Sequence, residues 1–231
     1  MPFFYDATYI LVLIGAVLSM VASAKVKSTY AKYAQVRSLS GMTGEAAARR
    51  ILSTAGIYDV KVQRVSGDLT DHYDPRNKTL NLSDTVYGST SVAAVGVAAH
   101  ECGHAIQHDR GYAPLRLRSA IVPVANFGAK VSWPLILLGL FLGGSGTLIQ
   151  IGILCFSLAV LFQLVTLPVE FNASSRAVRL LSETGILYEE ELKQTRKVLS
   201  AAALTYVAAA ASSLLQLLRL VLLFGNRRRD G

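Results

Sequence analysis

The chain has 231 residues, of which 52% are hydrophobic and 16% are charged, and its mean hydropathy is +0.41. This composition is too apolar for an ordinary soluble domain and indicates an integral membrane protein. The net charge of +8 could suggest nucleic acid, but the basic residues cluster beside apolar segments, where they orient a membrane protein instead. We therefore expect no nucleic-acid partner. The two cysteines, Cys102 and Cys155, lack the paired spacing of a disulfide framework.

Residues 3–24 form the first apolar run, which is long enough to cross a bilayer as a helix. Ala22-Ser23-Ala24 resembles a signal-peptidase site, but the start of the run carries only Asp6, whereas a signal peptide begins with basic residues. We therefore expect a retained membrane anchor. Four basic residues follow directly: Lys25, Lys27, Lys32 and Arg37. The positive-inside rule then predicts that the N-terminus is outside and that the next domain is cytoplasmic.

Residues 25–118 are predicted to form this cytoplasmic insert, a small α+β region with no long apolar run before residue 92. Thr43 can cap a short helix, and residues 60–65 resemble a strand. Residues 69–73 and 79–83 flank a turn and predict a β-hairpin. An exposed strand at 79–83 would either pair with an extended substrate or be an ordinary edge strand.

The insert ends with an HExxH motif, from His100 to His104, preceded by a run of small apolar residues that favours a helix. Residues four apart share one face of a helix, with Cβ atoms about 5–6 Å apart, so the two imidazoles can bind one zinc ion. Glu101 is the neighbour of His100 and occupies the general-base position of a metalloprotease. The alternative is a buried helix whose histidines only form hydrogen bonds. The cost of ionisable groups in an apolar helix favours the metal.

Two more apolar runs, residues 119–142 and 147–168, predict a second and a third membrane segment joined by a glycine-rich turn. Lys130 interrupts the first of them, so it must either face the protein interior or lie in a part of the helix outside the membrane. Basic residues flank this membrane hairpin and place both of its ends on the cytoplasmic side: Arg116, Arg118, Arg176 and Arg179.

Residues 169–199 form a charged helical region, and residues 201–224 form a fourth apolar segment that ends in three arginines at 227–229. Four spans from an outside N-terminus would place these arginines outside, against the positive-inside rule. The last segment is therefore either a fourth span or a re-entrant or surface-lying helix that carries Arg219.

A catalytic zinc ion needs a third protein ligand besides the two histidines. His108 lies eight residues after His100, about 12 Å along a helix, which is too far for one ion to bind both. Glu170 lies at the end of the returning membrane segment, directly after Pro168 and Val169, and is our preferred third ligand. Its alternative role is to mark the membrane boundary at the start of a solvated helix.

Four stretches of the sequence carry a resemblance to a known family: residues 71–76, 100–108, 111–115 and 167–174. In these stretches, and in the spacing of its apolar segments, the chain resembles the YugP-type bacterial membrane zinc metallopeptidases. The resemblance implies a multi-pass protein of the bacterial plasma membrane, with one zinc ion per chain at the cytoplasmic face.

Glu170 also resembles the third-ligand glutamate of the wider group of membrane-bound gluzincins, which begins an ExxAD-like motif. Here Ala173 matches that motif, but Ser174 stands in place of the acid. The resemblance therefore does not supply the aspartate that orients a ligand histidine in those relatives. Four residues are possible substitutes: Asn172, Asp84, Asp68 and Asp109.

These observations predict a mainly α membrane protein of about four transmembrane helices, with a small cytoplasmic zincin-like α+β insert that carries a β-hairpin and the HExxH helix. The whole chain, residues 1–231, would form a single peptidase domain. It would hydrolyse peptide bonds of a peptide or membrane-protein substrate, using His100, His104 and Glu170 as zinc ligands and Glu101 as the base. Six further residues are candidates for stabilising the oxyanion or supporting the ligands: His72, Tyr73, Tyr112, Asn172, Arg176 and His108.

The alternative function is a non-catalytic membrane scaffold or chaperone whose structural zinc has a fourth protein ligand, His108 or Cys102. A transporter has little support, because the predicted spans contain no matched pair of broken helices.

Overall fold

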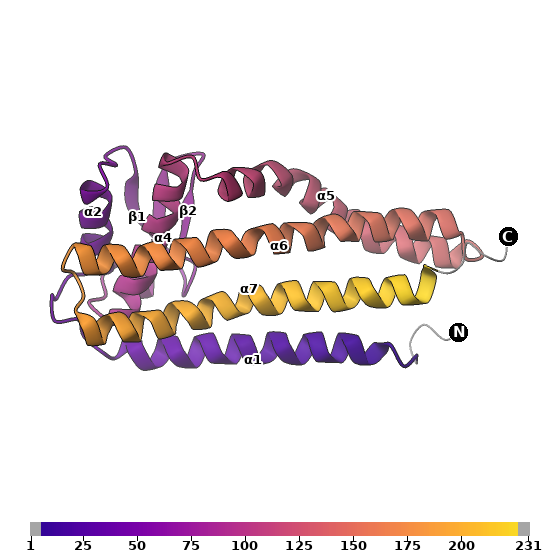
Figure 1. Cartoon of the computed structure of the whole chain (residues 1–231), viewed down its shortest axis with the longest axis horizontal. Coiled ribbons are helices and arrows are strands. Elements are labelled where there is room, and N and C mark those ends of the chain that lie inside the picture. The colour runs from indigo at the N-terminus through magenta and orange to yellow at the C-terminus, as the bar shows by residue number, and fades with distance from the viewer. Residues whose placement is uncertain (1–5, 226–231) are drawn as a thin grey trace. The chain divides into compact units, whose positions relative to one another are not determined.

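The computed structural model describes residues 6–225, which are mainly helical and include one small three-stranded sheet (Figure 1). The elements are α1 (Tyr9–Ala34), α2 (Gly44–Thr54), β1 (Lys61–Val65), β2 (His72–Asp74), β3 (Thr79–Ser83), α3 (Asp84–Tyr87), α4 (Val92–Asp109), α5 (Ala113–Phe141), α6 (Gly146–Glu183) and α7 (Glu189–Phe224). They form two compact units. Of the described residues, the first contains 6–23, 117–167 and 205–225, and the second contains 24–116 and 168–204.

Four helices, α1, α5, α6 and α7, are long and apolar enough to cross a membrane. The prediction of four apolar segments of membrane-spanning length is thus confirmed. Helix α6 continues through Pro168 to Glu183, so it joins the predicted third span, residues 147–168, to the first part of the helical region predicted for residues 169–199. Residues 3–5 of the first predicted segment and the arginines at 227–229 lie outside the described residues.

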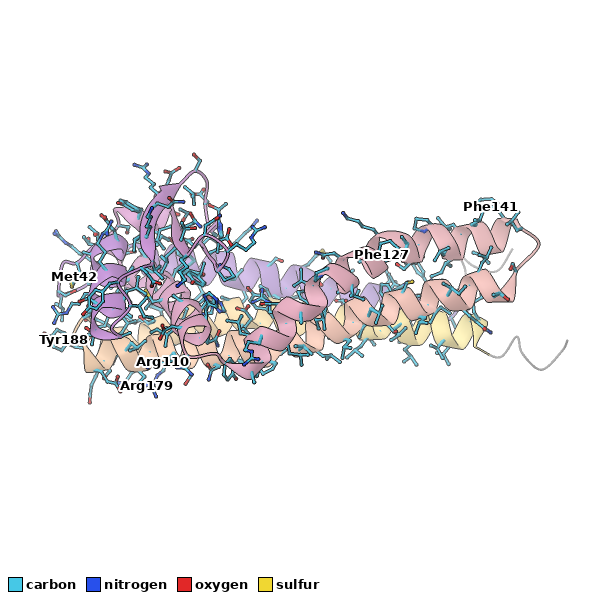
Figure 2. All side chains as sticks on the ribbon, turned by 90° about the horizontal axis from the view of Figure 1, so that it is seen from above. Met42, Arg110, Phe127, Phe141, Arg179 and Tyr188 are labelled. Atoms are coloured by element: carbon cyan, nitrogen blue, oxygen red, sulfur yellow. The ribbon has the colours of Figure 1, made fainter. Side chains whose placement is uncertain are left out.

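The first unit packs its helices through small residues and a few large apolar ones. Ile136, Ile149, Leu220 and Phe224 form its buried cluster. A Cβ on Gly152 would lie 2.9 Å from the Ser132 carbonyl oxygen, so only glycine allows α5 and α6 to approach this closely. On its outer surface α5 exposes large apolar side chains, among them Phe127 and Phe141 (Figure 2), as a helix in contact with lipid does.

Two charged side chains within the predicted spans differ in their surroundings. Arg219 of α7 is only 3% exposed, and its guanidinium lies 3.0 Å from the Asp6 carboxylate and over the Tyr9 ring. The protein itself thus compensates this charge, which removes one reason to exclude α7 from the membrane. Lys130 of α5 is exposed, so the expectation that it could face the protein interior is wrong.

The sheet belongs to the second unit and has the order β1-β3-β2. Strand β2 pairs antiparallel with β3, with Tyr73 opposite Leu80, so the predicted hairpin is present. Strand β1 pairs parallel with the other edge of β3. The expectation that residues 79–83 offer an exposed edge is therefore wrong, because both edges of β3 already form ladder hydrogen bonds.

The core of the second unit lies between the sheet, α2 and α4. Leu80 and Leu82 of β3 are fully buried with Ile51 of α2, and each contributes about 1.5–3 kcal/mol by burial. The hydroxyl of Thr43 accepts a hydrogen bond from the Ala46 amide and caps α2, as predicted. This core fixes one face of α4 and leaves its opposite face to α6.

Candidate metal centre

Helix α4 presents the two histidines of the HExxH motif. Ser91 begins the helix by accepting a hydrogen bond from the Ala94 amide, 3.2 Å away, and the small residues that follow allow close packing on all sides. His100 and His104 lie one turn apart, with ring centroids separated by 4.8 Å. The helical spacing therefore directs both imidazoles to the same place.

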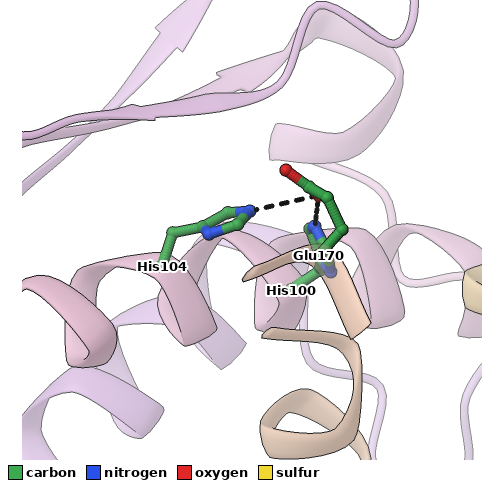
Figure 3. Close-up of side chains that lie close together, drawn as sticks. All are labelled: His100, His104 and Glu170. Atoms are coloured by element: carbon green, nitrogen blue, oxygen red, sulfur yellow. Dashed lines mark ion pairs between the residues drawn. The ribbon is translucent and has the colours of Figure 1, made fainter. Parts of the chain in front are cut away.

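Glu170 of α6 completes a group of three possible metal ligands (Figure 3). Its Oε2 lies 3.3 Å from Nε2 of His100 and 3.5 Å from Nε2 of His104, and its side chain is 3% exposed. Ligand atoms about 2.1 Å from a tetrahedral zinc ion are about 3.4 Å apart. The spacing and the chemistry of this donor set thus fit zinc.

Gly103 allows α6 to come near enough for Glu170 to reach the histidines. A Cβ at this position would lie 2.7 Å from the carbonyl oxygen and 3.1 Å from the Cα of Ala173. The first distance is shorter than real Cβ contacts and the second is shorter than most of them, and both obstacles are backbone atoms, which cannot rotate away as a side chain can. The glycine between the two histidines is therefore required by the contact between α4 and α6.

The Nδ1 atoms of both histidines have partners that the sequence analysis did not identify. Nδ1 of His104 lies 3.0 Å from Oε1 of Gln107. An amide oxygen only accepts hydrogen bonds, so this contact places the proton on Nδ1 and leaves Nε2 available to a metal. Nδ1 of His100 lies 3.2 Å from the hydroxyl of Ser174, the residue that replaces the expected acid.

Gln107 is fully buried and also connects α4 to α6. Its Nε2 donates to the carbonyl oxygen of Val169 and to Oδ1 of Asn172, both at 2.9 Å. Arg176 in turn donates to the same Asn172 oxygen at 2.7 Å. Asn172, an expected supporting residue, thus reaches His104 only through Gln107. The role of Gln107 could have been predicted from its position three residues after His104, because residues at this spacing lie on one face of a helix.

The negative charges of the site act on His104. Burial disfavours its imidazolium form, but the hydrogen bond to Glu170 and the charge of Glu101 outweigh this effect and raise the pKa of His104. Glu101 is itself 8% exposed. A buried pair of carboxylates beside two imidazoles is an environment in which a divalent cation is favoured.

The other predicted candidates contact partners outside this group of three ligands. The His108 Nδ1 and Tyr73 Oη atoms are 2.9 Å apart, and burial raises the pKa of Tyr73 to about 12. The His72 ring is held between the Thr70 carbonyl and the Asn81 amide. Tyr112 lies under the guanidinium of Arg176, 5.8 Å from its ring centroid.

None of the three aspartates considered as substitutes for the acid that orients a ligand histidine is seen to contact His100 or His104. Asp84 pairs with Arg64, Asp109 pairs with Arg110, and Asp68 is exposed.

A four-ligand structural site finds no support among residues 6–225. The only group of three or more potential ligands found there consists of His100, His104 and Glu170. The Cys102 thiol is fully buried and directed to the Ala48 carbonyl, and burial raises its pKa well above the ordinary value. His108 is directed to Tyr73 instead. A metal ion held by these three residues alone would keep a fourth position for water or substrate.

Comparison with known proteins assigns the chain to a family. Residues 8–225 match the family described as "Putative neutral zinc metallopeptidase". The chain is 53% identical over 213 residues to the "Putative membrane protease YugP" of Bacillus subtilis (strain 168). This alignment covers 92% of the present chain and 94% of the relative. No solved structure matches the chain. Together with the four apolar helices, this similarity places the protein in a membrane.

Proposed function

Because the chain belongs to the neutral zinc metallopeptidase family, we propose that it is a zinc-dependent membrane endopeptidase of the gluzincin type, with a zincin-like catalytic unit. The observation that carries this proposal is the convergence of Glu170 on His100 and His104, within 3.3 and 3.5 Å. These three residues would hold one zinc ion. Two of them come from the motif, and the third comes from a helix more than sixty residues later in the chain.

Held by these three residues, zinc would supply a Lewis acid that lowers the pKa of a bound water and polarises the scissile carbonyl. Glu101 accepts the proton of the attacking water and then gives it to the leaving amine. Its place directly after His100 keeps the carboxylate beside the metal ligands without making it one of them. Gln107 and Ser174 hold the two imidazoles by their Nδ1 atoms, so that both Nε2 atoms keep their direction.

Stabilisation of the oxyanion requires a hydrogen-bond donor close to the reacting carbonyl. Tyr73 is one candidate, since burial raises the pKa of its phenol to about 12 and the hydroxyl is a neutral donor at neutral pH. Its partner His108 would orient the hydroxyl. Arg176, Tyr112 and His72 are the other candidates in the second unit.

The substrate would be a peptide or a segment of a membrane protein, cleaved at the cytoplasmic face of the bilayer. The lysines that follow the first apolar run support this orientation. A buried site with an open ligand position suits an extended peptide backbone better than a folded protein. Neither nucleic acid nor a soluble partner is required by the proposal.

The test is to replace Glu101 by Gln in the full-length protein and to measure zinc content and peptide cleavage separately. Loss of a general base reduces the rate by about 10²–10⁴-fold, whereas the zinc content should remain at one ion per chain. Glu183→Gln, on the exposed end of α6, is the matched control and should keep both. A Glu101→Gln protein that cleaves peptides at the original rate would overturn the mechanism.

A further inference from the structure

A basic groove lies between α1 and α7 in the second unit, apart from the metal centre. Its volume is about 650 Å³, within the range of about 300–1,000 Å³ that is typical of small-molecule sites. Three lysines line it, Lys25 and Lys32 from α1 and Lys197 from α7. Figure 1 shows the two helices running next to each other.

The groove carries positive charge that the protein does not neutralise. No carboxylate lines it, and among residues 6–225 none forms a salt bridge with any of the three lysines. Hydroxyl groups of Thr29 and Ser200 also line the groove. Ammonium groups and hydroxyls together form hydrogen bonds with phosphate oxygens.

The position of the groove along both helices indicates where its ligand comes from. On α1 the lysines begin directly after the apolar run that ends at Ala24, and on α7 Lys197 precedes the apolar run that begins at Ala201. Ala201 and Leu204 also line the groove. Both helices thus change from polar to apolar at this point, which is the depth at which phospholipid headgroups lie.

We propose that this groove binds the headgroup of an anionic phospholipid, such as phosphatidylglycerol. The lysine ammoniums contact the phosphate, the hydroxyls contact phosphate or glycerol oxygens, and the start of an acyl chain lies against Ala201 and Leu204. The bilayer supplies such lipids at high local concentration, whereas a soluble phosphate compound gains nothing from the apolar side of the groove. This inference does not depend on peptidase activity.

The test compares two double variants of the full-length protein in detergent micelles, with dioleoylphosphatidylglycerol as the probe. Lys32→Gln with Lys197→Gln removes two charges from the groove. Lys27→Gln with Arg196→Gln removes two charges from the same helices at exposed positions that do not line the groove. Binding is measured by the lipid concentration needed to raise the Tm.

We expect the groove variant to bind phosphatidylglycerol about thirtyfold more weakly, which corresponds to about 1 kcal/mol for each lysine that contacts the phosphate. The control variant should retain the affinity of the original protein. Phosphatidylcholine and sn-glycerol 3-phosphate should give no shift at the same concentrations. Equal losses in both variants would show that only total charge matters and would overturn the proposal. An equal Tm shift with phosphatidylcholine would show that the groove does not distinguish an anionic headgroup from a zwitterionic one. An equal shift with sn-glycerol 3-phosphate would show that the acyl chains are not required. Either result would overturn the proposal.

Discussion

The side-chain oxygen of Gln107 lies 3.0 Å from Nδ1 of His104, and this contact fixes which nitrogen of the imidazole faces the metal position. The same amide donates to the Val169 carbonyl, one residue before Glu170. A single buried side chain therefore orients one predicted zinc ligand and holds the backbone next to another. Gln107 acts on the site through these ligands and is a positioning residue.

Replacing Gln107 by Leu should weaken zinc binding by about 10–100-fold, the usual effect of removing a residue that supports a metal ligand. Leucine keeps the volume but removes the link from α4 to the Val169 carbonyl and leaves Nδ1 of His104 without its acceptor, which also costs about 1–3 kcal/mol of stability. The measurement is a competition titration of zinc against a chelator, with helical content checked by circular dichroism. A well-folded Gln107→Leu protein of unchanged zinc affinity would contradict the role assigned to Gln107.

Glu170→Gln should reduce the affinity for zinc by about 100-fold. Structural zinc binding of about 10–16 kcal/mol, shared among four ligands, gives about 3 kcal/mol for each ligand, and an amide is a weaker ligand than a carboxylate. The zinc content of the purified protein, measured after dialysis against a weak chelator, should fall below one ion per chain. Glu183→Gln on the same helix is the control. If both variants kept a full complement of zinc, Glu170 would not be a ligand.

Gly103→Ala should lower the stability by about 1–3 kcal/mol, the typical cost of overpacking, because its new methyl group would meet the backbone of Ala173. The displaced α6 should also carry Glu170 away from the histidines, so zinc affinity should fall together with the Tm. Gly88→Ala is the matched control, since no atom lies within 4 Å of a Cβ there and its φ of −94° suits alanine. Equal behaviour of the two variants would contradict the close packing at Gly103.

The sequence was sufficient for features that depend on local spacing or on overall composition. The four apolar helices follow from length and hydropathy. The pair His100 and His104 follows from helical periodicity, and His108 was set aside because of the rise of the helix. Glu170 was selected because the chain returns across a membrane hairpin, and its 3.3 Å distance from His100 agrees with that choice.

Features that depend on packing between distant segments were not predictable. The parallel pairing of β1 with β3 requires a partner strand that no local pattern specifies, so residues 79–83 were wrongly expected at an edge. The contact of Ser174 with His100 depends on the angle at which α6 meets α4. Arg219 was difficult to place because its partner, Asp6, lies 213 positions away in the sequence.

The pair of Arg219 and Asp6 gives the last prediction. Arg219→Met leaves the Asp6 carboxylate without its cation, and we expect the Tm in detergent to fall by about 5 °C, because removing one partner of a buried pair is strongly destabilising. Asp6→Asn alone should also lower the Tm, since it removes a charged partner from the buried guanidinium. The double variant should recover much of the loss, because no unpaired charge remains. This double-mutant cycle is measured by thermal unfolding. If the decreases in Tm of the two single variants simply add in the double variant, the two residues do not interact. Another contact would then have to stabilise the arginine within the apolar segment of α7.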